Sequence, residues 1–119
     1  MISNMDVFRI YSAMARHAAE SQQMSATNIA HADEPGYKAG SIESFEAYLK
    51  RTASAGAAAG PQDAFRVGVA GTPASPDGNT VSLEHEIFKS AEAVGQHEMA
   101  LTVYKKSMDL LRAAIGKKY

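Results

Sequence analysis

The segment from Asn4 to Ala32 contains neither glycine nor proline over 29 consecutive residues. One stripe within it follows the alternating four-and-three spacing of a coiled-coil seam, and it consists of Val7, Tyr11, Met14, Ala18, Ser21 and Ser25. Ile10 and Ile29 flank this stripe. The pattern predicts a helix about 40 Å long, which is longer than a thin core can cover. A core helix in a small bundle is the alternative interpretation.

Glu34, Pro35, Gly36 and Tyr37 predict a sharp end to this helix. Proline followed by glycine is typical of a type II turn, in which the glycine takes a positive φ. Pro35 also disfavours the helical conformation at Glu34, so we expect the helix to end at or before Asp33.

A second long helix is predicted at the C-terminal end of the chain. Asp77-Gly78-Asn79 indicates a turn, after which Ser82 is the expected N-cap. Glu84 and Glu86 then fall in the first turn, where the positive helix end favours carboxylates. Apolar side chains follow at seam spacing: Ile87, Ala91, Val94, Leu101, Tyr104, Met108, Leu111 and Ile115. Basic residues gather near the end, where the helix dipole favours cations: Lys105, Lys106, Arg112, Lys117 and Lys118.

The middle of the chain has a different composition, because 18 of the 29 residues from Thr52 to Thr80 are Ala, Gly, Pro or Ser. The tract from Ala53 to Gly60 is expected to be a flexible loop. One short strand with a half-buried face is predicted from the alternation of Phe65, Val67 and Val69. A short helix is predicted before the tract, from the spacing of Ile42, Phe45, Tyr48 and Leu49. We therefore divide the chain into residues 1–33, 34–80 and 81–119.

The apolar content is unusually rich in small side chains. Alanine contributes 22 residues, whereas Ile, Leu, Val, Met and Phe together contribute 27, and there is no Trp. Alanine buries little area, and a chain of 119 residues buries a smaller share of its surface than a large one. We therefore expect the isolated chain to be marginally stable and to gain stability by self-association.

Composition and charge exclude several classes of function. A net charge of −1, without a basic stripe, argues against a nucleic-acid partner. The absence of cysteine excludes disulfides, zinc–thiolate sites and cysteine nucleophiles. The N-terminus has no basic region followed by an apolar stretch, so no cleaved secretory signal is predicted. No run of about 18 apolar residues predicts a transmembrane helix.

The histidines do not form a predicted metal site. His97-Glu98 begins like the zinc-protease helix motif, but Leu101 stands where the second histidine is required. His85 is too far from His97, and His17 too far from His31, for one ion to reach both. We interpret all four as solvated or facing a partner. The nucleophile-elbow and phosphate-loop motifs are also missing. The sequence therefore predicts no enzyme, no cofactor and no small-molecule substrate.

The first turn resembles a known signature. The segment Asn28-Ile29-Ala30-His31-Ala32-Asp33-Glu34-Pro35-Gly36-Tyr37-Lys38 resembles the A-N-x-A-N-x-x-T-P-G-Y-K motif of the flagellar basal-body rod, hook and related axial proteins. The matching residues are Asn28, Ala30, Pro35, Gly36, Tyr37 and Lys38. His31 replaces the usual Asn, and Glu34 replaces the usual Thr. Residues 77–84 and the C-terminal helix are also similar to this family, and the short middle is most similar to its small proximal-rod members.

This resemblance implies a fold, a location and a set of partners. The two terminal helices would form an antiparallel coiled-coil pair, and many subunits would pack into a hollow rod that serves as the export channel and transmits torque. The partners would be other copies of the chain, adjacent rod subunits, the rod-to-membrane-ring junction protein and the flagellar type III export apparatus. The chain would be located in the basal body, in the periplasmic space. A soluble helical adaptor or export chaperone is the alternative function.

The mechanism we expect is ordering coupled to assembly. Incorporation would bury Val7, Tyr11 and Met14 against residues of the C-terminal helix, in the same subunit or in neighbours, and the residues concerned are Leu101, Tyr104, Met108 and Leu111. Ordering the chain costs about 1–2 kcal/mol per residue in backbone entropy, so we expect the terminal segments to be largely disordered or molten before assembly and to be stabilised only in the filled assembly.

Overall fold

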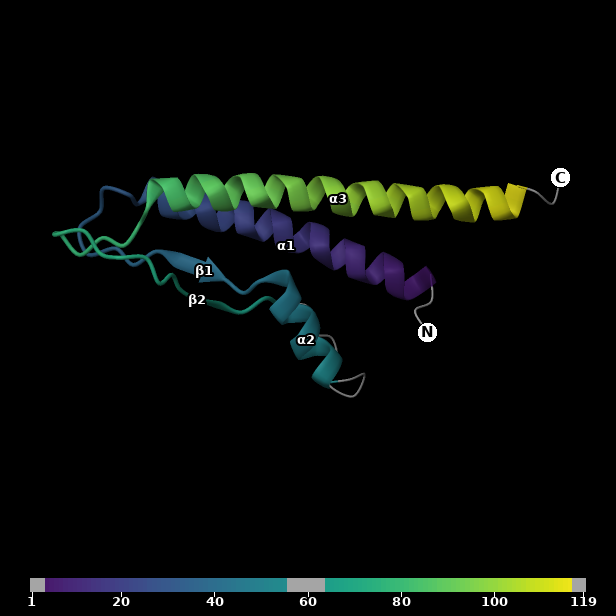
Figure 1. The fold of residues 1–119 in the computed structure, drawn as a ribbon, viewed down its shortest axis with the longest axis horizontal. Coiled ribbons are helices and arrows are strands. Elements are labelled where there is room, and N and C mark those ends of the chain that lie inside the picture. The colour runs from purple at the N-terminus through teal and green to yellow at the C-terminus, as the bar shows by residue number, and fades with distance from the viewer. Residues whose placement is uncertain (1–3, 56–63, 117–119) are drawn as a thin grey trace.

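The computed structural model describes residues 4–55 and 64–116 of the chain (Figure 1). The described elements are α1 (Asn4–Ala30), β1 (Gly40–Ile42), α2 (Phe45–Ala55), β2 (Val67–Val69) and α3 (Leu83–Gly116). The mainly helical fold predicted from the sequence is thus confirmed, as are the two long terminal helices. The helix prediction for Lys117 and Lys118 and most of the predicted Ala53–Gly60 loop lie outside the described residues. Ala53 to Ala55 belong to the end of α2.

The two long helices pack side by side, and α3 extends beyond the N-terminus of α1 (Figure 1). Their contacts run in opposite sequence order. Phe8, near the start of α1, contacts Tyr104 in the second half of α3, whereas Gln22, further along α1, is hydrogen-bonded to Ser90 in the first half of α3. The molecule is elongated, with extents of 68 × 30 × 15 Å and a radius of gyration of 18.1 Å. A compact domain of this length would have a radius of about 13.5 Å. Much of α3 therefore has no layer of protein over its outer side.

Small and polar side chains join α1 to α3. On α3 the buried residues are Glu86, Ala93 and Ala100, at intervals of seven. Gln96 Nε2 donates to the carbonyl of Met14 at 3.0 Å, and Ser90 Oγ donates to Gln22 Oε1 at 2.8 Å. Alanines at the inner positions let the helices approach closely but bury little apolar area.

The apolar core lies on another side of α1, under the middle segment. Its buried members are Ala13, Phe45, Tyr48 and Phe65, and the side chains packed around them are Ile10, Met14, Ile42 and Leu49. The ring of Tyr48 lies 4.7 Å from that of Phe65. The middle segment therefore supplies the buried aromatic side chains of this core.

The two strands form a small antiparallel sheet in which Ser41 faces Gly68. Only part of the strand prediction is confirmed. Phe65 is buried but precedes β2, whereas Val67 and Val69 are 64% and 71% exposed, so the predicted half-buried face is wrong. The physical reason is that α2 and α1 reach only Phe65. Ile42, predicted in the short helix, lies in β1 instead.

An ion pair connects this sheet to α2. The Arg51 guanidinium donates to both carboxylate oxygens of Glu43, at 2.6 and 3.3 Å, and the backbone N–H of Arg66 donates to one of them at 2.8 Å. The hydrogen bond from Arg51 lowers the pKa of Glu43 below its usual value of 4.5, more than burial raises it. Glu43 thus joins β1, α2 and the start of β2.

Candidate functional site

The turn after α1 has the predicted geometry. Gly36 has a φ of 75°, and the Tyr37 N–H donates to the carbonyl of Glu34 at 3.2 Å. A positive φ at the third position together with this hydrogen bond defines a type II turn. Nothing lies within 4 Å of a Cβ built at Gly36, so the requirement for glycine there comes from the backbone alone.

Asn28 fastens the end of α1 to β1. Its side chain is fully buried, and its amide donates to the Gly40 carbonyl at 3.0 Å while its Oδ1 accepts from the Gly40 N–H at 2.9 Å. A Cβ at Gly40 would lie 2.6 Å from Met24 Sδ. Asn28, the first signature residue, therefore bonds both backbone polar groups of Gly40, a position where any larger residue would press against the Met24 side chain.

Asn79 fastens the same turn to the segment that precedes α3. Its Nδ2 donates to the carbonyls of His31 at 2.9 Å and Glu34 at 2.6 Å, and its Oδ1 accepts from the Val81 N–H at 2.7 Å. The side chain is 3% exposed. One amide thus bonds two carbonyls of the turn that follows α1, each of which also accepts a backbone hydrogen bond within that turn.

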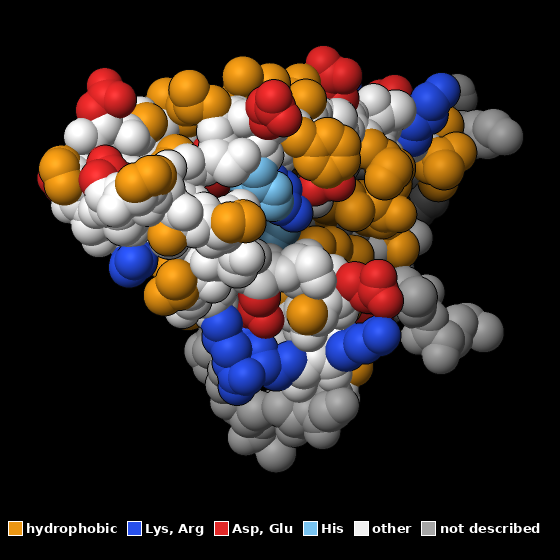
Figure 2. Space-filling model, turned by 60° about the vertical axis from the view of Figure 1, so that its left-hand side comes forward, with side chains coloured by type: hydrophobic (Ala, Val, Ile, Leu, Met, Phe, Trp, Pro, Cys, Tyr) orange, Lys and Arg blue, Asp and Glu red, His pale blue; other side chains and the backbone are white. Residues whose placement is uncertain are grey.

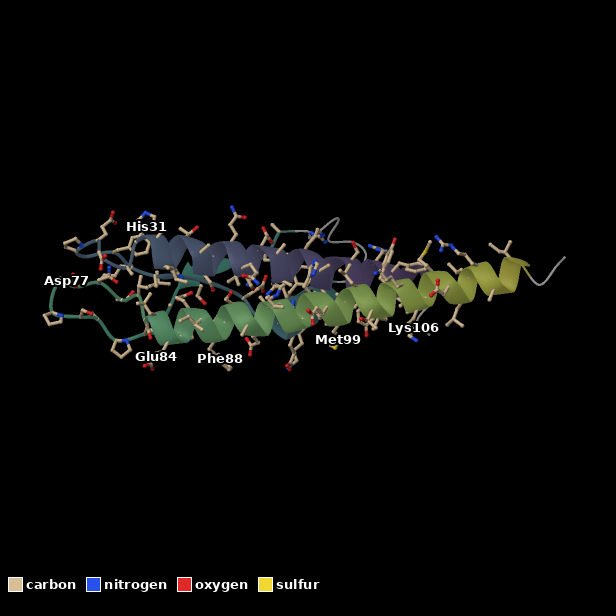
Figure 3. All side chains as sticks on the ribbon, turned by 90° about the horizontal axis from the view of Figure 1, so that it is seen from above. His31, Asp77, Glu84, Phe88, Met99 and Lys106 are labelled. Carbon is tan, nitrogen blue, oxygen red and sulfur yellow. The ribbon has the colours of Figure 1, made fainter. Side chains whose placement is uncertain are left out.

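Further hydrogen bonds join the two segments along their length. The N–H of Gly36 donates to the Asp77 carbonyl at 2.9 Å, and that of Thr80 to the Tyr37 carbonyl at 3.0 Å. The Lys38 ammonium donates to the Gly78 carbonyl at 2.8 Å. We call residues 28–40 and 72–82 together the clasp. Figure 3 shows His31 and Asp77 at this end of the molecule.

The signature residues have different positions in the clasp. The rings of His31 and Tyr37 stack with their centroids 4.4 Å apart and only 6° between their planes. Ala30 is the exposed last residue of α1, and Pro35 is exposed in the turn. His31 and Glu34 are the two positions that differ from the signature. Asn79 contacts only their backbone carbonyls, so these hydrogen bonds do not depend on which side chain is present.

The predicted N-cap of α3 is confirmed within the clasp. The hydroxyl of Ser82 accepts from the His85 N–H at 3.3 Å, one turn into the helix. The turn at Gly78 is also confirmed, since its φ is 88°.

The predicted seam residues of α1 and α3 lie in different surroundings. Val7, Tyr11 and Met14 are half-buried, as are Met108 and Leu111, and Tyr104 contacts Phe8 with ring centroids 5.3 Å apart. The others on α3 are exposed: Ile87 at 64%, Val94 at 45%, Leu101 at 41% and Ile115 at 62%. The inner face of α3 instead carries Glu86 and alanines. The contact between α1 and α3 therefore leaves most of this apolar stripe uncovered.

His17 is not solvated, contrary to the sequence prediction. It is 5% exposed, its Nε2 donates to the Glu43 carbonyl at 2.6 Å, and its Nδ1 accepts from Gln96 at 2.9 Å. Its ring lies edge-on to Phe65, with centroids 5.0 Å apart. His17 is thus a satisfied core residue that links α1, α3 and the middle segment.

Sequence reasoning missed Asn79 and Thr80 as parts of the site. Thr80 Oγ1 accepts from the Ala39 N–H at 2.8 Å, and its carbonyl accepts from the Thr72 hydroxyl. The signal available was an asparagine directly after Asp-Gly, a type of residue that satisfies local backbone groups. Its partners 45 and 48 residues away could not be read from the sequence.

The described residues contain no group of three or more acidic or histidine side chains placed to hold a metal ion. Within the same residues, no helix combines the length and apolar character needed to cross a bilayer. No protein-family model matches the chain, and no curated protein matches it significantly.

Proposed function

We propose that this chain is a structural subunit of the bacterial flagellar basal-body rod, most like the small proximal-rod subunit FlgB, and that it is not an enzyme. One observation carries the proposal: the two segments that resemble the family, residues 28–38 and 77–81, are hydrogen-bonded to each other. Two segments some 45 positions apart in the chain thus form one site. This supports the proposal, because two segments that resemble the same family are expected to share one structural role.

The helix pair supplies the assembly element of this proposal. We assign α1 and α3 to an antiparallel coiled-coil pair in the rod wall. The apolar stripe of α3, at intervals of seven, consists of Ile87, Val94, Leu101, Met108 and Ile115. Neighbouring subunits would cover this stripe by heterologous contacts, which generate an open helical tube.

Partners and location follow from the same proposal. The stripe would contact other copies and adjacent rod subunits, including the rod-to-membrane-ring junction protein, in the periplasmic part of the basal body. The chain would reach that position through the flagellar type III export apparatus.

Electron microscopy of basal bodies from cells that lack this chain tests the proposal. We expect basal bodies that stop at the membrane ring, with no rod, and rescue by the intact gene. Complete rods and hooks in the deletion strain would contradict it and favour the adaptor or export-chaperone alternative.

A further inference from the structure

A polar cavity of about 130 Å³ lies between α1, the segment around β1 and the first half of α3. Its wall includes hydroxyls from two directions, Ser21 and Ser25 on α1, and Ser41 in β1 with Ser44 just after it. Figure 2 shows a hollow in the surface where histidine and basic side chains are visible among apolar ones. The cavity lies beside the clasp and shares Gly40 with it.

Glu86 is the unusual residue in this wall. It is 3% exposed and shares the inner face of α3 with Ala93 and Ala100. Its carboxylate forms no hydrogen bond or ion pair with any residue in the described ranges 4–55 and 64–116. No fully buried side-chain oxygen or nitrogen atom in the described residues lacks a hydrogen-bond partner, so the little exposure that Glu86 keeps includes its carboxylate, which borders the cavity. A carboxylate with so little contact with water and no protein partner is unfavourable. The N-terminal turn of α3 offsets this only in part.

The neighbouring charged groups in the wall already have partners. Glu43 is paired with Arg51 at 2.6 Å, and Lys89 and Glu92, both in the wall, are paired with each other at 3.5 Å. Both ring nitrogens of His17 are hydrogen-bonded. His85 also lines the cavity, on the residue before Glu86. The cavity therefore presents an unmatched acceptor beside hydroxyls that can accept further hydrogen bonds.

We propose that this cavity binds the ammonium or guanidinium group of a lysine or arginine side chain from another protein chain, with Glu86 as its counter-ion. The volume is below the 300–1,000 Å³ that is usual for small-molecule sites, and it suits one extended side chain. The serine hydroxyls accept the remaining N–H groups of the bound cation. This inference does not depend on the rod assignment, because any partner that presents a basic side chain satisfies it.

Nuclear magnetic resonance titration of the full chain tests the inference, with N-acetyl-lysine methylamide and N-acetyl-arginine methylamide as probes. We expect saturable shifts of amides around Ser25, Ser41 and Ala93 with at least one probe, and none with the uncharged N-acetyl-norleucine methylamide. Glu86→Gln should weaken binding at least tenfold, whereas Glu84→Gln, an exposed glutamate in the same turn, should leave it unchanged.

Three results would overturn the inference. They are the absence of saturable shifts with both basic probes, equal binding by Glu86→Gln, and saturable shifts with Mg²⁺ or Zn²⁺ alone. Urea unfolding of Glu86→Leu provides a second readout. The unpartnered carboxylate predicts a raised urea midpoint for this variant, and a lowered midpoint would mean that Glu86 already has a partner within its own chain.

Discussion

The two ends of the helix pair are built on different principles. At the clasp, buried amides and backbone groups meet through directional hydrogen bonds, and Asn28 and Asn79 are at most 3% exposed. Toward the other end, α3 presents apolar side chains to solvent, with Leu110 at 72% and Ile115 at 62% exposed. Figure 3 shows Phe88 and Met99 on the side of α3 that faces away from α1. The hydrogen bonds of the clasp are complete within the chain, whereas the outer side of α3 has apolar surface left for a partner along its length, from Ile87 near the clasp to Ile115.

The two regions therefore suit different tasks: the clasp fixes the fold of the chain itself, and the apolar side of α3 is suited to association with other chains. Hydrogen bonds fix which backbone groups meet and leave little tolerance for substitution when they are buried. Apolar contacts are non-directional and scale with area. The clasp can therefore fix where the chain reverses, while the α3 stripe can adapt to more than one neighbour.

The largest effect is expected from removing the amide of Asn79. Asn79→Leu removes three hydrogen bonds of the clasp and leaves the Val81 N–H without its partner, while the His31 and Glu34 carbonyls keep their backbone hydrogen bonds within the turn. We expect a loss of about 3 kcal/mol in the free energy of unfolding. Urea unfolding followed by circular dichroism measures it. The matched control is Gln23→Leu, which replaces an exposed amide on α1 and should change stability by less than about 0.5 kcal/mol. An equal loss of stability in the two variants would show that the clasp hydrogen bonds of Asn79 do not stabilise the fold.

Backbone strain in the turn gives the next effect. Gly36→Val places a branched side chain at a φ of 75°, which should cost about 2 kcal/mol and impair motility in cells. Gly71→Val is the control, because Gly71 is exposed, has no positive φ and has open space around a Cβ. Thermal unfolding of both variants separates conformational strain from side-chain bulk. Normal stability and motility of Gly36→Val would refute the type II turn.

Some parts of the clasp depend only on adjacent residues in the chain, and these parts could be predicted from the sequence. Pro35 and Gly36 set the turn, and Ser82 caps α3, because each acts on the adjacent backbone. The pairing of Asn79 with the end of α1 depends on how the chain folds back. It has no local signal, so it was not predicted.

The orientation of α3 was also beyond sequence reasoning. Apolar periodicity predicted a seam through Ile87 and Val94 and left open whether the same subunit or a neighbour covers it, and the structure places Ala93 and Ala100 inward instead. Close packing against α1 selects small side chains, and an apolar stripe cannot by itself say whether its own chain or another covers it. In the same way, nothing local showed that Phe65 would be covered while Val67 and Val69 would not.

A smaller, pH-dependent effect is expected at the Glu43–Arg51 pair, which lies outside the clasp. Arg51 lowers the pKa of Glu43, so the folded state binds this proton less readily than the unfolded state. The stabilisation is present above the unfolded pKa near 4.5 and is lost as the pH falls through the lower folded pKa. Glu43→Gln should lower the urea midpoint at pH 7 and flatten its decline below about pH 5. An unchanged pH profile would contradict this role.

The smallest effect on the isolated chain is expected from the exposed stripe. Ile87→Ser should change the free energy of unfolding by less than about 0.5 kcal/mol, since Ile87 is 64% exposed and the two residues have similar helix propensity. The same variant should fail to restore motility to a deletion strain, whereas Thr102→Ser, a change at an exposed polar residue elsewhere on α3, should restore it. A fully motile Ile87→Ser strain would remove the stripe from the proposed assembly contacts.

Hydrogen exchange along α3 in the isolated chain tests the contrast between the two ends most directly. The account predicts strong protection of amides in residues 86–96, near the clasp and α1, and weak protection in residues 108–116, which gain protection only when a partner binds. Uniformly strong protection to residue 116 in the isolated chain would contradict it, because α3 would then be complete without a partner.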